Sequence, residues 1–316
     1  MFILIITKDE FISHDLIILL LKKGHKIRFV YTNKNLSYTR LNIINNIEFI
    51  YGNVFDCNFL RDVMIDIDYV YHNYSYGFPL FTNKDNKYIF QCNIQSTKNI
   101  VNASLKSNIK KLIYISSAYS MGYIKKNNTY YASESYSTHN IYDNMCSYAK
   151  SLYLSECEIW RGIAEGLDAI IINPTNIITS NCYPNIINIL YYHLKQKIYL
   201  YNSYYYNGYI GLKDLVIILI KLMESSICNE KFIINAENIK LKDMFSFISQ
   251  HNNIEYNSVK QSNIKDIFHF YLKKSEKFKP LDMLSKRNII FNNTKIRQAI
   301  DIKFHSIKDI ILRPNA

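Results

Sequence analysis

No stretch of the 316 residues reaches the roughly 18 uninterrupted apolar residues of a membrane-spanning helix, so the sequence predicts none. The first six residues carry no basic group ahead of their apolar run, which predicts a strand and not a signal peptide. The six cysteines include no Cys-x-x-Cys pair, and the eight histidines show no metal-ligand spacing. We therefore expect no metal site, reduced and mostly buried thiols, and a cytoplasmic location.

The charge of the chain is strongly positive, with a formal net charge of +12 and a pI near 9.2. There is, however, no arginine-rich stripe and no nucleic-acid-binding motif, and lysines are scattered along the chain. Glycine (8) and proline (5) are scarce while tyrosine (28) is abundant, a bias typical of AT-rich codons that also explains much of the lysine excess. A nucleic-acid partner is therefore disfavoured, because net charge alone is nonspecific.

Short apolar runs rich in β-branched residues alternate with helix-length stretches, which predicts a parallel sheet built from βαβ units. The length suits one large or two modest domains. In the second half, apolar spacing predicts helices over residues 186–194 and 215–222, and Tyr204–Tyr206 form either an aromatic ligand platform or a loop packed on neighbouring structure. The predicted strands are residues 2–6, 27–31, 70–72, 112–115 and 169–172.

Several longer segments of the chain read as sequence motifs that follow one another in a fixed order. Residues 47–56 read as a strand that ends in a Gly-Asn-x-x-Asp turn, and residues 111–122 as a strand that leads through Ser117 to Gly122. Residues 148–156 read Tyr-Ala-Lys-Ser-Leu-Tyr-Leu-Ser-Glu. The other segments are 68–72, 93–101, 158–167, 170–175, 209–224 and 293–296.

In this order the chain resembles an extended short-chain dehydrogenase/reductase of the dihydroflavonol-reductase-like or NAD-dependent epimerase/dehydratase type. The resemblance implies an α/β fold, a Rossmann-type doubly wound parallel sheet with a smaller C-terminal substrate cap. Residues 1–180 would form the dinucleotide-binding-type domain. Residues 181–316 would form most of the cap, with some segments returning to the Rossmann core.

The resemblance also assigns the chemical site. It places Ser117 at the position of the serine that hydrogen-bonds the substrate oxygen and Tyr148 at the position of the proton donor. In the family a lysine follows this tyrosine four residues later, one helical turn on; here that residue is Leu152. Because a free tyrosine has a pKa of about 10, loss of the ammonium group predicts a poor proton shuttle. Lys150 is a poor substitute, since two residues along a helix turn its stem away.

The cofactor implied by the resemblance is NAD or NADP, but its phosphate loop is altered. Rossmann glycines let the main chain approach the pyrophosphate at a helix N-terminus, whereas the first glycine here is Gly24. Lys8, Asp9 and Glu10 stand in the turn, where the two carboxylates would cap the helix and repel phosphate. The family's cofactor positions correspond to Thr7, Phe11, Ile12, Thr32, Asn53, Val54, Tyr74, Asn93 and Pro174.

Three functions stay open at this point. The first is a degenerate family member, with weakened or lost NAD(P)-dependent catalysis, kept as a binding or structural protein. The second is a working NAD(P)-dependent oxidoreductase or nucleotide-sugar epimerase that acts on a carbonyl or hydroxyl substrate. A nucleic-acid-binding role is third. The partner would be an unidentified small molecule, with a homodimer through helices around residues 93–105 and 148–165 as a further alternative.

Overall fold

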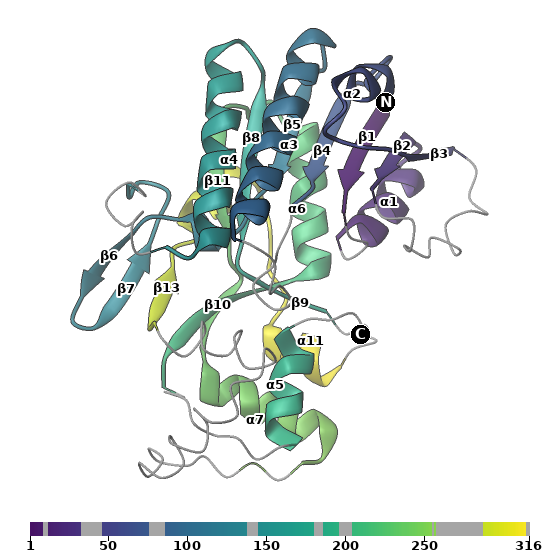
Figure 1. The fold of residues 1–316 in the computed structure, drawn as a ribbon. Coiled ribbons are helices and arrows are strands. Elements are labelled where there is room, and N and C mark those ends of the chain that lie inside the picture. Colours follow the sequence, from purple (N-terminus) through teal and green to yellow (C-terminus); the bar gives the residue numbers. More distant parts are fainter. Residues whose placement is uncertain are drawn as a thin grey trace.

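The computed structural model describes residues 1–8, 12–32, 46–75, 86–137, 145–179, 186–195, 204–254, 256 and 287–313. A sheet of seven parallel strands forms its centre, in the order β3-β2-β1-β4-β5-β8-β11 (Figure 1). The predicted Rossmann-type parallel sheet is thus confirmed. The strands are β1 (Phe2–Thr7), β2 (Lys26–Tyr31), β3 (Ile47–Tyr51), β4 (Tyr69–Asn73), β5 (Lys111–Ile115), β8 (Ala169–Pro174) and β11 (Glu230–Ile234).

The order of strands reverses beside β1. The chain runs from β1 outward through β2 and β3, then crosses to the other side of β1 for β4, β5, β8 and β11. In open α/β sheets, ligands bind at such a switch point, outside the carboxyl ends of the strands. The carboxyl ends of β1 and β4 are Thr7 and Asn73, which are direct neighbours in register.

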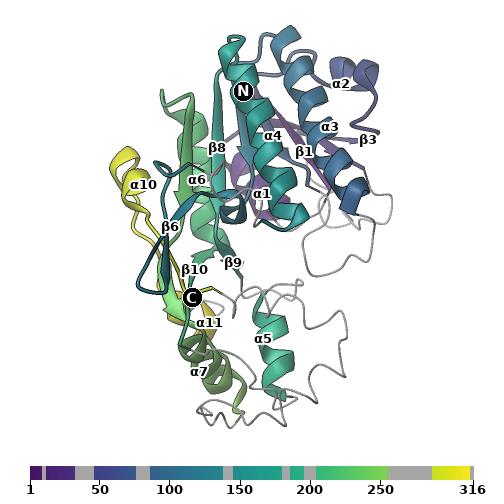
Figure 2. The same ribbon diagram turned by 60° about the vertical axis from the view of Figure 1, so that its left-hand side comes forward.

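Side chains of β1 alternate between the two faces of the sheet, as the two-residue period of a strand requires. Ile3 and Ile5 belong to the buried cluster that includes α1 (Ser13–Lys22) and α6 (Leu212–Glu224). Leu4 and Ile6 belong to the cluster of the opposite face, beneath three other helices. These are α2 (Cys57–Val63), α3 (Asn86–Lys106) and α4 (Ser147–Ala164), of which α3 and α4 lie side by side in both views (Figures 1 and 2).

Most of the smaller sheets and helices lie beyond the carboxyl ends of the strands, whereas α10 (Thr294–Ala299) lies beside β11. One mixed sheet has the order β12-β10-β9, and a second has the order β13-β7-β6. In Figure 2, α5 and α7 stand below the large sheet. The proposed division into two domains near residue 180 stays a prediction. The elements are β6 (Tyr123–Lys126), β7 (Thr129–Ala132), β9 (Asn176–Ile178), β10 (Tyr206–Gly211), β12 (Glu237–Lys240), β13 (Ile289–Phe291), α5 (Ile186–Lys195), α7 (Leu241–Asn252), α10 (Thr294–Ala299) and α11 (Ile307–Leu312).

The edge strand β11 has main-chain groups that are bound by side chains from other parts of the chain. The main-chain N–H of Ile233 donates to Glu134 Oε1 over 2.7 Å. Lys295 Nζ donates to the carbonyl oxygen of Lys231 over 2.9 Å and pairs with Glu230 at 2.5 Å. Both contacts occupy groups that would otherwise be open to another strand.

Two sequence predictions about the whole chain can be compared with the structure. None of the described helices is long and apolar enough to cross a membrane. The described cysteines are free thiols, but the prediction that most are buried is wrong: only Cys92 is buried, and Cys57, Cys146 and Cys157 are exposed. The three exposed residues lie at the start of a helix or on its outer side, where a small thiol needs no packing partner.

Candidate functional site

Ser117 lies directly after β5, at the carboxyl end of the sheet. It is extended, with φ −152° and ψ 150°, and it caps the short 3-10 helix η1 (Ala118–Ser120) by accepting the main-chain N–H of Tyr119 at 3.3 Å. The N–H of Ser120 returns to the carbonyl oxygen of Ser117 over 3.1 Å. Ser117 itself is half-buried. The predicted site serine therefore stands in a hydrogen-bonded turn that solvent reaches.

Tyr148 and Leu152 lie on the buried face of α4, one turn apart. Tyr148 is 8% exposed and Leu152 is fully buried, so an apolar side chain occupies the position at which the resemblance predicts a lysine. Lys150 is half-buried and lies outside that buried face. Tyr148 lies near the phenol of Tyr114 on β5, whose pKa is raised chiefly by burial, with a smaller contribution from the carboxylate of Glu156.

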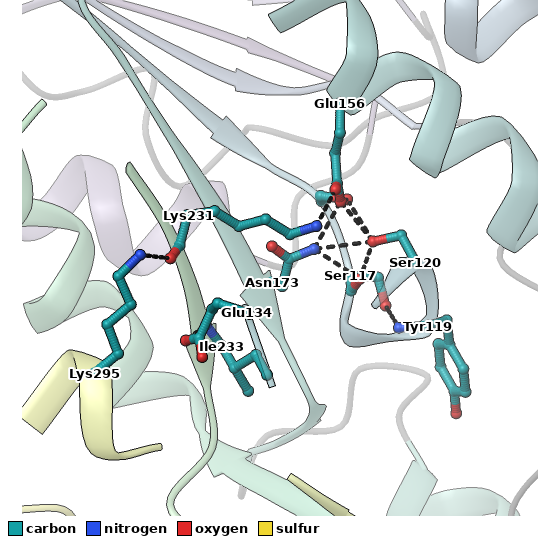
Figure 3. Close-up of polar contacts among 10 residues, drawn as sticks. Ser117, Tyr119, Ser120, Glu134, Glu156, Asn173, Lys231, Ile233 and Lys295 are labelled. Carbon is teal, nitrogen blue, oxygen red and sulfur yellow. Dashed lines mark hydrogen bonds and ion pairs between the residues drawn. The ribbon is translucent and has the colours of Figure 1, made fainter. Parts of the chain in front are cut away.

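Glu156 is the buried charge of this region, and sequence reasoning missed it. Its side chain is almost fully buried, yet it accepts hydrogen bonds from Ser116, Ser120 and Asn173 and pairs with Lys231 of β11 at 2.6 Å (Figure 3). Glu156 lies four residues after Leu152 on the same helix face. A glutamate on the buried face of a helix is rare unless it has a partner. The place of Glu156 on the same helix face as Leu152 could therefore have indicated a buried, paired carboxylate.

A second buried network lies behind the site and includes His72 at the end of β4. Its Nδ1 accepts the main-chain N–H of Tyr74 at 3.3 Å, which leaves the proton on Nε2, 2.9 Å from Thr97 Oγ1. Thr97 in turn donates to the carbonyl oxygen of Asn93 over 2.9 Å. Burial lowers the pKa of His72 to about 3, so the imidazole is neutral at physiological pH. These uncharged, buried hydrogen bonds fit a structural role behind the site.

Thr7 and its neighbours at the switch point form the candidate cofactor side. Thr7 is fully buried. Its hydroxyl donates to the main-chain carbonyl oxygen of Asn73 at 3.3 Å and accepts a hydrogen bond from the side-chain amide of Asn73 at 3.4 Å. Tyr74 is 5% exposed, and its ring meets Phe55 edge-on with the centroids 6.4 Å apart. Tyr74 and Val54 belong to one buried cluster. Tyr74 is therefore packed into the interior next to Val54.

The other predicted cofactor positions are spread along the carboxyl edge. Asn53 is exposed, and its Oδ1 accepts the main-chain N–H of Phe55 at 3.0 Å. Ile12 is buried at the start of α1, and Thr32 is half-buried just after β2. The predicted capping by Asp9 and Glu10, and the position of Phe11, lie outside the described residues. Of the remaining positions, Asn93 is buried between α3 and α4, and Pro174 is buried at the end of β8.

The structure thus brings the predicted residues to one edge of the sheet, in two groups. Thr7, Val54 and Tyr74 lie around β1 and β4, whereas Ser117 and Tyr148 lie around β5 and α4. Over the described residues, no group of three or more His, Cys, Asp or Glu side chains is arranged to hold a metal ion.

Comparison with known proteins identifies the family. The model of the NAD dependent epimerase/dehydratase family matches residues 9–203, and this chain belongs to that family. Among curated proteins, it is similar to the sterol demethylase protein B of Methylococcus capsulatus, with 19% identity over 240 residues, 75% of this chain and 70% of the relative.

Solved structures share the fold at low sequence identity. A UDP-glucose 4-epimerase from Thermotoga maritima, solved with UDP-glucose, superposes with a TM-score of 0.73 at 16% identity, covering 99% of this chain and 96% of that one. The dTDP-glucose 4,6-dehydratase DesIV from Streptomyces venezuelae, solved with NAD, gives a TM-score of 0.77 at 13% identity, covering 99% and 95%. These similarities support the extended short-chain dehydrogenase fold that the sequence predicted.

Proposed function

We propose that this chain is a family member in which NAD(P)-dependent hydride transfer is weakened or lost, and that it serves as a binding protein for a small molecule of the nucleotide-sugar class. The observation that carries the proposal is Leu152. Its side chain is fully buried one turn after Tyr148, so it can neither donate to a nicotinamide ribose nor favour the phenolate of Tyr148. Loss of a positioned acid/base partner costs about 10²–10⁴-fold in rate.

The sequence of the phosphate loop supports the same proposal. Lys8, Asp9 and Glu10 follow β1 where a Rossmann fold has glycines, and two carboxylates there oppose a pyrophosphate at the start of α1. At two of the predicted cofactor positions, Asn53 Oδ1 already accepts the N–H of Phe55, and Tyr74 is a large ring beside Val54. We expect NAD and NADP to bind weakly for these reasons.

The ligand class is proposed from the relatives. The epimerase was solved with UDP-glucose, and the dehydratase is named for dTDP-glucose, so both names refer to a sugar joined to a nucleoside diphosphate. Such a ligand is anionic, and the net charge of +12 would favour its approach. The half-buried Ser117 would then hydrogen-bond a sugar oxygen.

The test is calorimetric titration of the protein with NAD⁺, NADH, NADPH and UDP-glucose, together with an assay for reduction of carbonyl substrates and for epimerisation. We expect dinucleotide binding weaker than micromolar and little or no turnover. Micromolar binding of NADH or NADPH would overturn the cofactor part of the proposal. Robust activity that Tyr148→Phe abolishes and Leu152→Met leaves unchanged would overturn the catalytic part.

One observation favours the second candidate, a working NAD(P)-dependent oxidoreductase or nucleotide-sugar epimerase. The Ser117 turn is held by hydrogen bonds from η1 and from Asn173, an order that a discarded site would not need. The same titration and assay decide between the two candidates, because only the second gives turnover with the unmodified protein.

A homodimer through α3 and α4 is a further part of the proposal. The two helices lie side by side on one face of the sheet (Figure 1). Trp160 on α4 is 38% exposed, an unusual position for a large indole unless a partner covers it. Light scattering should give the mass of two chains, and Trp160→Glu should shift it toward one; a monomeric unmodified protein would contradict this.

A further inference from the structure

Glu156 joins four elements of the fold through one carboxylate. Its Oε1 accepts from Ser116 Oγ and Ser120 Oγ, each at 2.5 Å, and from Asn173 Nδ2 at 2.7 Å. Its Oε2 accepts from Lys231 Nζ at 2.6 Å. The contributing segments are α4, the turn after β5, β8 and β11 (Figure 3). A buried carboxylate is tolerated only when it is paired and hydrogen-bonded, and here it is both.

Two of these donors also hold the main chain of Ser117. The carbonyl oxygen of Ser117 accepts from Ser120 Oγ at 2.7 Å and from Asn173 Nδ2 at 2.9 Å. Asn173 Nδ2 and Ser120 Oγ are themselves 2.9 Å apart. The position of Ser117 is therefore linked to the Glu156 carboxylate through two side chains and no intervening loop.

Glu156 Oε1 acts only as an acceptor in this cluster, because each of its three partners is a hydroxyl or an amide N–H donor. Ser120 has a single hydroxyl proton, which is shared between Glu156 Oε1 and the carbonyl oxygen of Ser117, and Asn173 has two amide protons for the same two acceptors. Turning the Asn173 amide round would direct its oxygen at Glu156 Oε1 and at the carbonyl oxygen of Ser117, which is repulsive. The acceptor oxygen of Glu156 thus fixes the orientation of Asn173 that holds Ser117.

We infer that Glu156 is the positioning residue for Ser117, and that Lys231 is its counter-ion in the interior. The link between Glu156 and the turn rests on these contacts; the statement that Ser117 then meets a ligand rests on the proposed function. Glu156 lies eight residues, about 12 Å along the helix, from Tyr148, so Lys231 does not replace the missing lysine.

A matched control exists on the same edge strand. Lys295 and Glu230 form a second lysine–glutamate pair at 2.5 Å, but their side chains are 37% and 46% exposed. Among the described residues, neither side chain forms a hydrogen bond or ion pair with the Ser117 turn. The Lys231 and Glu156 side chains are only 14% and 2% exposed. Lys295 also donates to the main-chain carbonyl oxygen of Lys231. Lys295→Met thus removes an ion pair of the same composition and one main-chain contact of β11, but no contact of the Lys231 ammonium group or of the Glu156 carboxylate.

The first measurement is hydrogen–deuterium exchange of the full chain, read on peptides that cover residues 116–121. In Glu156→Gln we expect exchange in this turn to become roughly tenfold faster, while peptides of β1 and α1 keep their rates. Lys295→Met should leave the turn unchanged. If Glu156→Gln does not fold, Ser120→Ala, which deletes one hydroxyl between Glu156 and Ser117, should give the same local effect. An unchanged turn, or equal acceleration throughout the sheet, would overturn the inference.

The second measurement is a double-mutant cycle on affinity for UDP-glucose. Ser117→Ala should weaken binding by about fivefold, the value of one hydrogen bond. In the Glu156→Gln background the same change should cost less than about twofold, because Ser117 is already misplaced. The full loss should persist in Lys295→Met; equal losses in all backgrounds would overturn the positioning role. If the unmodified protein does not bind UDP-glucose, the proposed ligand is wrong, and the exchange measurement alone decides on Glu156.

Discussion

The side-chain amide of Asn93 on α3 donates to Ser151 Oγ on α4 over 2.8 Å, and that hydroxyl donates to the carbonyl oxygen of Tyr148 over 2.7 Å. Asn93 and Ser151 are both buried. The contact fixes the rotation of α4 against α3 at the residue before Leu152, and so it holds the leucine in the core. Tyr148, Ser151 and Leu152 are therefore set by one helix–helix contact.

Ser151→Ala should remove an acceptor from a buried amide and lower the free energy of unfolding by about 1–3 kcal/mol, as measured by urea denaturation. Ser104→Ala is the control, since Ser104 is equally buried but, among the described residues, its hydroxyl donates only to Met64 Sδ, at 3.8 Å. Ser104→Ala should lower the free energy of unfolding by less than Ser151→Ala does. Equal losses in both variants would show that the Asn93 contact contributes nothing specific.

Leu152→Lys should destabilise the protein by at least about 2 kcal/mol, because the ammonium must enter a fully buried apolar site or displace its surroundings. Leu152→Met, which keeps volume and polarity, should cost less than about 1.5 kcal/mol. Thermal and urea denaturation measure both. A lysine variant as stable as the methionine variant would indicate that α4 readily turns position 152 toward an open cofactor site.

The same substitution makes a prediction about catalysis. If the Rossmann framework is intact, Leu152→Lys should place an ammonium one turn from Tyr148 but should not restore hydride transfer by itself, since Lys8, Asp9 and Glu10 still replace the phosphate loop. Leu152→Lys combined with a Gly-x-x-Gly loop should give measurable oxidation of NADH. Turnover from Leu152→Lys alone would show that the existing loop accepts the cofactor.

His72 should make the fold sensitive to acid. Burial lowers its pKa from 6.5 to about 3, so between these values the unfolded chain binds a proton that the folded chain does not. The contribution of His72 to the free energy of unfolding is fully present above pH 6.5. It is lost as the pH falls toward 3, by about 1.4 kcal/mol per pH unit. Urea denaturation at a series of pH values across this window measures the slope.

The matched variant for this test is His72→Asn. Asparagine keeps an acceptor for the main-chain N–H of Tyr74 and removes the titrating ring. Its stability should be lower at neutral pH but less dependent on pH in the acid range. His251→Asn changes an exposed histidine and should keep the original slope. If His72→Asn keeps it too, His72 does not cause the acid sensitivity.

Gly122→Ala should destabilise the segment after η1. A Cβ at this position would lie 2.3 Å from the carbonyl oxygen of Tyr136 and 2.8 Å from main-chain atoms of Ser137, and neither can move as a flexible side chain would. We expect a loss of about 1–3 kcal/mol in thermal denaturation. Lys125→Ala, on an exposed part of β6, should stay within about 0.5 kcal/mol of the unmodified protein.

The central sheet could be predicted because its strands have a local signature. The apolar run at residues 2–6 became β1, and the spacing at residues 215–222 became part of α6. The order of motifs placed Ser117 after a strand and Tyr148 on a helix, as the structure has them, while the chemical roles of both residues stay predictions. These predictions held because strand period, helix period and motif order are all properties of neighbouring residues.

The Glu156 cluster could not be predicted in the same way. Lys231 follows Glu156 by 75 residues, and only the placement of β11 beside β8 brings the two together. Nothing in the pattern around Lys231 distinguishes it from the other lysines of a lysine-rich chain. The burial of Glu156 could have been inferred from its place four residues after Leu152, but its partners depend on tertiary structure.

The two side-chain contacts on β11 also limit how this protein can associate with itself. Glu134 occupies the N–H of Ile233, and Lys295 occupies the carbonyl oxygen of Lys231, so a strand from a second molecule would have to break an existing bond at each point. Continuous edge-to-edge growth of the sheet, the route to fibrous aggregates, is thereby opposed on the β11 side. Removing the Glu134 and Lys295 side chains should leave β11 open to pairing with a strand of a second molecule. The first sign would be slow, concentration-dependent aggregation of the folded protein.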